Sequence, residues 1–177
     1  MAKTREQIHD ELLVLRSQQD DAEAFAELVG RWQRRLWSYA RHLVGEEAAW
    51  EVSQESWLAI IKGLPRLERP GAFPYWAFRI VSGKCADWVR ARQRDRTVSL
   101  DSDPPQLATS PDTISPVSAA LGLLPPESRA VLLLHYGQEL GIREVALALQ
   151  IPEGTVKSRL HHARRRLGEL MEAQANE

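Results

Sequence analysis

Apolar residues recur every three or four positions along the first half of the chain. Over residues 24–44 this spacing predicts an amphipathic helix, and Gly45 is well placed to end it. The same spacing predicts helices at about 46–63 and 75–92. Residues 64–74 hold three prolines and a glycine, so they are predicted to form a loop. No window shows the sustained alternation of a β-strand, and we therefore predict an all-α fold.

The second half of the chain carries the pattern of a helix-turn-helix. Two short apolar helices are predicted at 127–136, where Gly137 ends the first, and at 142–150. A turn at Ile151 and Pro152 follows, and a longer helix continues to about residue 170. Between residues 154 and 168 this last helix has five cations, two histidines and no acid. Two short helices, a tight turn and a longer basic helix are typical of a DNA-binding unit.

A proline-rich segment separates these two halves. Residues 95–118 contain four prolines and many Ser and Thr, with no helical or strand period, as is typical of a flexible linker. All six tryptophans lie at or before Trp88. We predict a leading helix at 1–20, whose function is not assigned, and a first small domain at 21–94. The linker at 95–118 and a second small domain at 119–177 complete the chain.

The charge of the chain is nearly neutral only as an average. The formal net charge is −1, but residues 1–55 carry −4, residues 56–96 carry +6, residues 97–126 carry −3 and residues 127–177 carry 0. The +6 block and the basic helix are therefore candidate surfaces for a polyanion. Neither a membrane-spanning run nor a signal peptide is visible, and one cysteine cannot form an intrachain disulfide, so we expect a cytoplasmic protein.

The basic helix of the second domain is a candidate reader of duplex DNA. Residues near the start of such a helix meet base edges, and its other cations hold phosphates. We interpret Ser158 as a base-edge contact beside Lys157 and His162, and the cations at 164–166 as phosphate contacts. The alternative is a solvated basic face with no DNA.

The sequence offers no catalytic or metal-binding motif. Adjacent His161 and His162 point about 100° apart on a helix and have no cysteine or carboxylate to complete a zinc site. His42 and His135 lie in apolar stretches and are predicted to be hydrogen-bonded core histidines, and Cys85 a buried thiol. We expect no cofactor, no small-molecule substrate and no enzymatic activity.

The first domain has two candidate surfaces. In the +6 block, aromatic rings alternate with cations, an arrangement that binds single strands by stacking and phosphate contact. Most of these rings are expected in the core, but Phe73 stands in a Pro/Gly loop and is the better stacking candidate. The helix at 46–63 places acids on one side and mostly apolar residues on another. The acids, either a solvated face or a dock for a basic partner, are Glu47, Glu51 and Glu55; the other side holds Trp50, Ser53, Trp57, Ile60 and Ile61.

Four motifs, in this order, resemble bacterial RNA polymerase sigma factors of the extracytoplasmic-function (ECF) class. They are AFAELVGRWQRRLWSYA, EVSQESWLAI, FPYWAFRI with Asp87 downstream, and LPPESRAVLLLHY followed by IPEGTVKSRLHHARRRL. The resemblance covers residues 25–170, nearly the whole chain. It implies two helical domains, of the region 2 and region 4 types, that bind core RNA polymerase and promoter DNA. It also implies an anti-sigma protein as a candidate partner.

The resemblance assigns each segment a role. The helix at 46–63 would bind the clamp helices of the largest polymerase subunit through Glu51, Gln54, Glu55 and Trp57. The loop at 69–74 and the helix after it would melt the −10 element and capture an unstacked base, through Arg69, Phe73, Trp76, Phe78, Arg79, Gly83, Lys84 and Asp87. The last helix would read the −35 duplex through Thr155, Lys157, Ser158, Arg159, His161, His162, Arg165 and Arg166. The linker would thread toward the polymerase active site and the RNA exit path.

Three positions depart from the family pattern. The family usually has Asn in place of Gly83 and commonly Tyr in place of Phe78, so polar contacts near the −10 element are missing. The turn before the recognition helix commonly has Gly where this chain has Gln150, and a positive φ there would cost a non-glycine residue about 1 kcal/mol. Two other functions stay open at this point: a stand-alone transcriptional regulator that does not bind core polymerase, and a helical adaptor that binds only protein.

Overall fold

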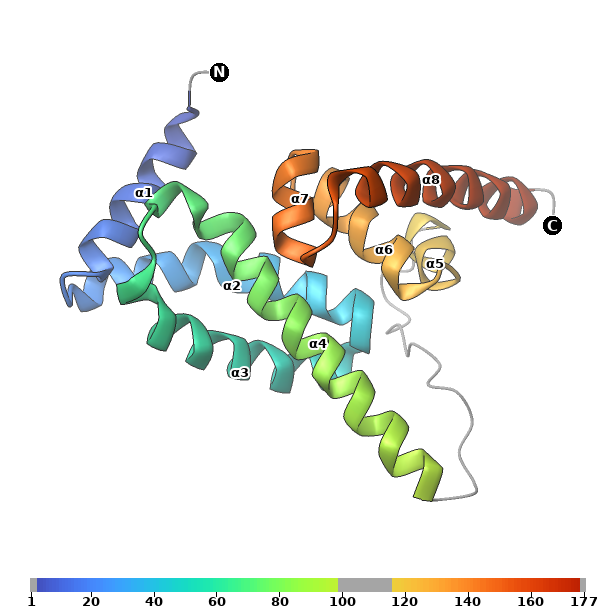
Figure 1. The fold of residues 1–177 in the computed structure, drawn as a ribbon, viewed down its shortest axis with the longest axis horizontal. Helices are drawn as coiled ribbons and strands as arrows, with labels where there is room; N and C mark the ends of the chain where they lie inside the picture. Colours follow the sequence, from blue (N-terminus) through green and yellow to red (C-terminus); the bar gives the residue numbers. More distant parts are fainter. Residues whose placement is uncertain (1–2, 99–115, 176–177) are drawn as a thin grey trace.

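The structure is a computed structural model that describes residues 3–98 and 116–175, and side chains up to residue 94 of the first part (Figure 1). These residues form helices and short connections with no strand among them, which confirms the all-α prediction. The first domain consists of α1 (Arg5–Ser17), α2 (Ala22–Val44), α3 (Glu46–Gly63) and α4 (Phe73–Val98), with 3-10 turns at Leu64–Arg66 and Pro70–Ala72. The second consists of α5 (Pro116–Gly122), α6 (Pro126–Leu132), α7 (Ile142–Leu149) and α8 (Glu153–Ala175).

The predicted helices are present, with differences at their ends. α6 continues as a π-helical turn at Leu133–Gly137, so the predicted helix does end at Gly137. α4 begins at Phe73 and extends to Val98, and α5 begins at Pro116, so both helices enter the predicted linker. Pro74 and Pro116 lie in first turns, where the missing N–H of proline breaks no helical hydrogen bond. The rest of the predicted linker, residues 99–115, lies outside the described residues.

Local sequence signals position the helices of the first domain. The Oγ1 atom of Thr4 accepts a hydrogen bond from the backbone N–H of Gln7, whose side chain accepts one from the Thr4 N–H in return. Asp21 caps α2 by accepting from the N–H of Ala24; this bond and the Arg16 guanidinium lower the pKa of the Asp21 carboxyl. Gly45 joins α2 to α3 at φ 89°, a conformation that favours glycine.

The core of the first domain is a set of interlocking rings. Trp32 of α2 meets Phe73 and Phe78 of α4 edge-on, at centroid distances of 5.2 and 6.1 Å. Tyr39 packs against Phe78 at 5.3 Å, and its hydroxyl shares a 2.9 Å hydrogen bond with Ser82. Burial raises the pKa of the Tyr39 hydroxyl. α4 is thereby fixed across α2, and the end of α4 projects past the bundle (Figure 1).

The second domain is a helix-turn-helix. Val145 of α7 and Val156 and Leu160 of α8 are buried, and α8 also packs on α5 and α6. The turn between α7 and α8 begins at Gln150, which has φ 55° and ψ 43°. The left-handed conformation expected of this position is therefore present, on a residue that is not glycine.

Candidate nucleic-acid and polymerase interfaces

The first half of α8 presents the predicted −35 face. Its apolar stripe, Val156, Leu160 and Ala163, is buried against the domain and fixes which side of the helix faces outward. Most of the predicted readers are exposed, and only two are half-buried. The exposed readers are Lys157, Ser158, His161, His162, Arg165 and Arg166, and the half-buried ones are Thr155 and Arg159.

Several α8 side chains are held by weak local contacts. The Ser158 hydroxyl donates to the backbone oxygen of Thr155 at 3.1 Å, and Arg164 donates to the hydroxyl of Tyr136 at 3.2 Å. Glu169 lies 3.1 Å from the Arg166 guanidinium and 3.6 Å from that of Arg165. Exposed pairs of this kind contribute little free energy, so a phosphate can displace them.

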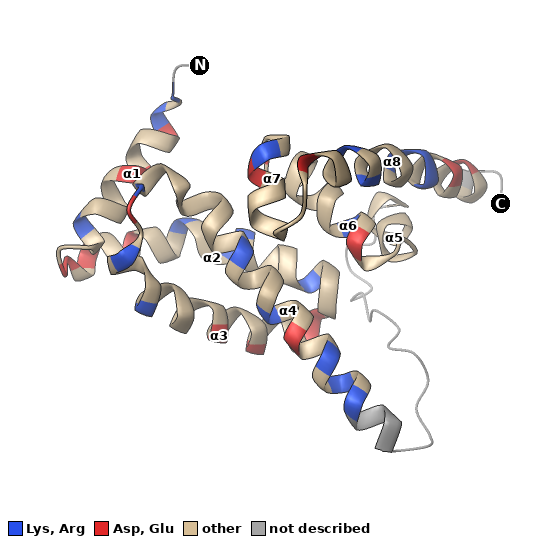
Figure 2. Ribbon diagram, viewed as in Figure 1, with Lys and Arg blue, Asp and Glu red and all other residues tan. Residues whose placement is uncertain are grey.

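Most of the predicted −10 residues lie on α4, and two of them form ion pairs. Arg79 is exposed, and Lys84 donates to Glu55 of α3 at 2.9 Å. Further along, Arg90 donates to Asp87 at 2.7 Å. Cations gather along the projecting end of α4 and along the first half of α8 (Figure 2).

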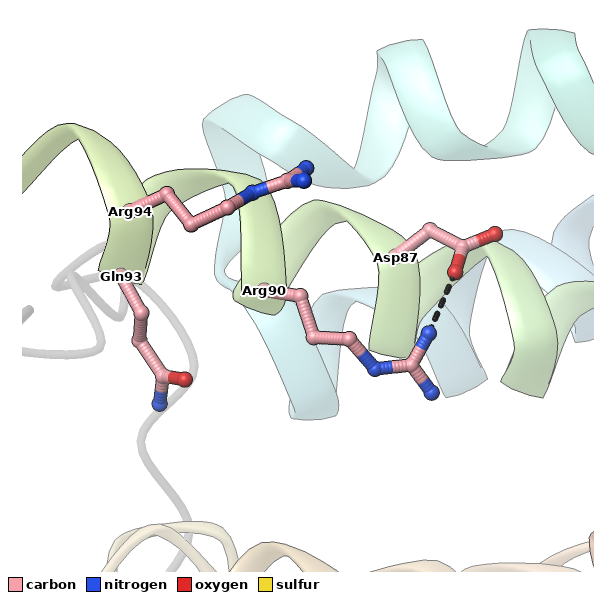
Figure 3. A pocket seen from close by; sticks show the side chains of 4 residues that line it. All are labelled: Asp87, Arg90, Gln93 and Arg94. Carbon is pink, nitrogen blue, oxygen red and sulfur yellow. Dashed lines mark hydrogen bonds and ion pairs between the residues drawn. The ribbon is translucent and has the colours of Figure 1, made fainter.

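An open pocket of about 630 Å³ lies along the projecting part of α4. It is lined by Asp87, Arg90, Gln93 and Arg94 (Figure 3). Three of these four side chains are charged, and the Asp87–Arg90 pair lies at one end of the pocket. An elongated polyanion fits such a surface better than a small apolar ligand does.

The expectation that Phe73 lies in a loop and is harder to bury than the other rings is wrong. Its exposed fraction is 0%, because the 3-10 turn at Pro70–Ala72 brings the chain back onto the bundle and starts α4 with this ring facing Trp32. Phe78 is also fully buried, between Trp32 and Tyr39. Neither ring can stack on a base without leaving the core.

The accessible residues at this end of α4 are neighbours of Phe73. Arg69 donates to the hydroxyl of Tyr75 at 2.9 Å, and Tyr75 and Trp76 are both half-buried. A Cβ atom at Gly63 would lie 2.8 Å from the Trp76 ring, so the missing side chain of Gly63 allows that ring to come close to the α3 backbone. Tyr75 is absent from the site residues assigned by the resemblance, although its place between Arg69 and Trp76 in the aromatic and cationic run could have indicated it.

The exposed face of α3 does not coincide with the mostly apolar side that helical spacing predicted for this helix. Ser53 and Ile60 are buried, and Trp57 is half-buried with its ring edge-on to Phe25 at 6.1 Å. Trp50 and Ile61 instead point outward, 52% and 48% exposed. Together with Leu58, which is 58% exposed, they flank the exposed Gln54 and follow helical spacing. Exposed Glu47, Glu51 and Glu55 run beside them, so one face of α3 combines apolar and acidic side chains.

The remaining candidate groups have structural roles. The Nδ1 atoms of His42 and His135 lie 2.7 Å and 2.8 Å from the backbone oxygens of Ser38 and Leu140, so both are hydrogen-bonded as predicted, but both are half-buried and neither belongs to the core. Cys85 is buried as predicted, and burial raises the pKa of its thiol to about 12. Over the described residues, no group of His, Cys, Asp and Glu could hold a metal ion. No described helix has both the length and the apolar character that crossing a bilayer requires.

The chain matches two family models. Residues 28–95 match Sigma-70 region 2, and residues 115–167 match Sigma-70, region 4. The ECF RNA polymerase sigma factor SigE of Mycolicibacterium smegmatis is 30% identical over 162 residues, which cover 85% of this chain and 63% of that protein. The ECF RNA polymerase sigma-E factor of Salmonella typhimurium is 29% identical over 177 residues, with 90% and 92% coverage. The chain belongs to the ECF sigma factors.

Two solved structures share the fold. CnrH, in complex with the cytosolic domain of CnrY, superposes with a TM-score of 0.70 at 25% identity, over 93% of this chain and 98% of CnrH. The sigma factor RpoE of Bartonella quintana, in complex with the anti-sigma factor NepR, gives 0.73 at 22% identity, over 85% and 98%. The region 2 match spans α2 to α4 and the region 4 match α5 to most of α8; α1 lies outside both.

Family membership decides between the functions left open by the sequence. ECF sigma factors direct RNA polymerase to specific promoters, and this chain has both of the sigma regions needed for that function. A stand-alone regulator is therefore not favoured. Proteins of this class are DNA-binding transcription initiation factors.

Proposed function

We propose that this ECF sigma factor uses α3 to bind core RNA polymerase, α4 to open the −10 element and α8 to read the −35 duplex. The observation that carries the proposal is the division of exposed side chains among these three helices. α3 offers an apolar and acidic face, whereas α4 and α8 offer cations on surfaces that their own domains leave open (Figure 2). Each face has the chemistry that its partner needs.

The polymerase contact is proposed to centre on Trp50, Leu58 and Ile61. Large apolar side chains that a folded domain leaves exposed on one helix face mark a protein interface. Gln54 lies within this stripe, and Glu51 and Glu55 border it, which suits a partner with basic residues at the rim. Trp57 is proposed to support this face from below through its contact with Phe25.

The −35 contact is proposed to use the exposed residues near the start of α8. Ser158 and Lys157 lie where a recognition helix meets base edges, and His161 and His162 follow one turn later. Arg165 and Arg166 extend the cationic face toward phosphates, and Thr155 and Arg159 border it. For the −10 element we propose Tyr75 and Trp76 as the stacking rings, with Arg69, Arg79, Lys84 and Asp87 as polar contacts beside Gly83.

We also propose that the protein acts in the cytoplasm as a binding subunit without catalytic activity, cofactor or small-molecule substrate. An anti-sigma partner that contacts both domains stays a prediction. A path for the linker through polymerase likewise stays a prediction, because most of that segment lies outside the described residues.

Transcription in vitro tests the proposal. Core polymerase would be supplied with fragments of the source genome, with and without this chain, and the transcripts would be mapped. Discrete start sites that need both components are expected. If the chain adds none on any fragment, the proposed function is wrong.

Matched variants separate the two kinds of contact. Leu58→Gln should weaken association with core polymerase, whereas the half-buried Trp76→Ala should leave that association intact and reduce promoter opening. Arg165→Ala with Arg166→Ala should weaken duplex binding by the assembled holoenzyme and flatten its salt dependence. A Leu58→Gln chain that bound core polymerase as tightly as the wild type would exclude α3 as the docking face.

A further inference from the structure

α1 lies outside both family matches and carries none of the residues of the proposed function. Its buried side chains, Leu13 and Val14, anchor it in the core of the first domain. Besides α2, it contacts the two 3-10 turns that join α3 to α4, and Figure 1 shows it beside the start of α4. This connection, residues 64–72, includes Arg69 and leads directly to the proposed stacking rings. α1 is therefore in a position to set the shape of the proposed −10 surface.

Gln18, directly after the last residue of α1, ties the first half of this connection to the helix. Its Nε2 atom donates to the backbone oxygens of Leu64 and Leu67, at 2.9 and 2.8 Å. A side-chain amide nitrogen has two hydrogens, so both donors of the half-buried Gln18 are used. The two acceptors come after the end of α3, where backbone oxygens have no α-helical partner. One side chain thus bridges the beginning and the end of the first 3-10 turn.

Glu11 contacts the second half of the connection. A Cβ atom at Gly71 would lie 2.6 Å from the Oε1 atom of Glu11, so this carboxylate lies directly against the Gly71 backbone. The other carboxylate oxygen accepts a hydrogen bond from Lys3 Nζ at 2.6 Å. The bare backbone of Gly71 therefore lets the second 3-10 turn approach α1 closely.

Between these two contacts the connection is short and exposed. Leu67 is half-buried, whereas Glu68 and Arg69 are exposed, so packing alone does little to fix them. Arg69 donates to the Tyr75 hydroxyl at 2.9 Å, which links the exposed segment to a ring at the start of α4. Fixing a backbone segment costs conformational entropy. Because α1 orders the segment during folding, that cost does not fall on DNA binding.

We propose that α1 is a fixed support for the proposed −10 surface and that Gln18 is its positioning residue. The inference rests on the proposed function of Arg69, Tyr75 and Trp76. It adds that their selectivity among bases depends on a side chain that acts only through the backbone of residues 64–67. Gln18 contributes its two hydrogen bonds rather than bulk or charge. Without them the exposed segment moves, and the surface accepts different bases more equally.

Matched variants isolate the two hydrogen bonds. Gln18→Ala removes the side-chain amide, and Gln18→Glu keeps the length but replaces both donors with a carboxylate, which only accepts. Gln19→Ala makes the same change on the next residue, which is exposed and bonds to α1 through its backbone. Val52→Ala changes a buried position of α3, about three helical turns before Gly63, and lowers stability without altering Gln18.

Amide hydrogen exchange in the full chain measures the support directly. The N–H groups of Leu67 and Ala72 donate within the connection, each to the backbone oxygen three residues earlier. Exchange at these two amides should be about tenfold faster in both Gln18 variants, the change that one lost hydrogen bond brings to a local opening. Gln19→Ala should exchange as the wild type does, and circular dichroism checks that the helices persist. Equal exchange in Gln18→Ala and the wild type would overturn the support.

Selection from single strands measures the effect on DNA. Holoenzyme assembled with each variant would select from a library of random single-stranded oligonucleotides, and the selected strands would be sequenced. The wild type should favour particular bases, and the ratio of the best base to the worst should fall about tenfold in both Gln18 variants. Gln19→Ala and Val52→Ala should keep the wild-type ratio. A loss of overall stability reduces the amount of holoenzyme without changing which base it prefers.

The outcomes distinguish the role of α1 from the proposed function. If the wild type selects no base, the proposed −10 surface is wrong, and the role of α1, which rests on it, is wrong as well. If the wild type selects and both Gln18 variants select as sharply, only the role of α1 is wrong. A ratio that falls as far in Val52→Ala as in Gln18→Ala would also overturn it, because Gln18 would then act through general stability alone.

Discussion

Lys84 of α4 and Glu55 of α3 form an ion pair, with 2.9 Å between Nζ and Oε2. One partner belongs to the proposed −10 surface and the other to the rim of the proposed polymerase face. The side chains are 34% and 53% exposed, so solvent screens the pair and its contribution to stability is below about 1 kcal/mol. The pair joins two binding surfaces without fixing the fold.

Replacing either partner should therefore affect binding more than folding. Glu55→Gln is expected to lower the free energy of unfolding by less than about 1 kcal/mol, measured by urea titration. Lys84→Gln should weaken promoter opening by the holoenzyme while leaving the affinity for core polymerase unchanged. Glu55→Gln, at the rim of the proposed polymerase face, should instead weaken the affinity for core polymerase. If Lys84→Gln lowered that affinity by as much as Glu55→Gln does, the two residues would act at one surface only.

Replacing Gly83 and Gly63, two glycines at helical positions, with alanine should change the free energy of unfolding in opposite directions. A Cβ atom at Gly83 meets nothing within 4 Å, so Gly83→Ala should raise the free energy of unfolding by about 1 kcal/mol through helix propensity. A Cβ atom at Gly63 would lie 2.8 Å from the Trp76 ring. Gly63→Ala should destabilise the protein, because the ring must move.

Urea unfolding of the two variants, followed by tryptophan fluorescence, checks this contrast. The same chemical change is made in both, so general effects of alanine cancel. A destabilising Gly83→Ala would contradict this reasoning, because it would mean that the open space beside the Gly83 backbone does not accept a methyl group.

The Gln150 turn gives a further prediction. Its φ of 55° and ψ of 43° are a left-handed conformation that costs a residue with a Cβ atom about 1 kcal/mol. Gln150→Gly should remove most of this strain and stabilise the second domain by up to about 1 kcal/mol, offset in part by the greater freedom of glycine in the unfolded chain. Gln150→Ala keeps the Cβ atom and should bring no gain; thermal unfolding of both variants is the measurement.

Helical spacing predicted most of the fold but not which apolar side is buried. The period of three to four residues located α2, α3 and α7 well, because it depends on local geometry. α3 has apolar residues on adjoining sides, and only its packing on α2 and α4 shows that Ile60 is buried and Ile61 is not. The burial of Phe73 is not predictable for a similar reason, since the 3-10 turn before it packs on α1 and the ring itself packs on Trp32 of α2.

The contacts between the two domains cannot be predicted from the sequence, for a different reason. Arg129 and His42 are 87 positions apart, and Arg35 and Gln138 are 103 apart. No periodic pattern relates residues at such distances, and each side chain has an ordinary explanation within its own helix. Only the assembled chain shows that the two domains use these groups on each other.

The last prediction concerns pH and His42. Burial, together with the nearby Arg41 and Arg129, lowers the pKa of His42 from its ordinary value of 6.5. The unfolded chain therefore binds a proton at His42 more readily than the folded chain does. The stabilising contribution is complete above pH 6.5 and is lost as the pH falls through the lower pKa of the folded state.

Unfolding by urea between pH 7.5 and 5 should accordingly show stability that falls below about pH 6.5. His42→Gln, which cannot take up the proton, should flatten this part of the profile, whereas the exposed His161→Gln serves as the matched control and should keep it. A profile that His42→Gln leaves unchanged would assign the acid sensitivity to another group.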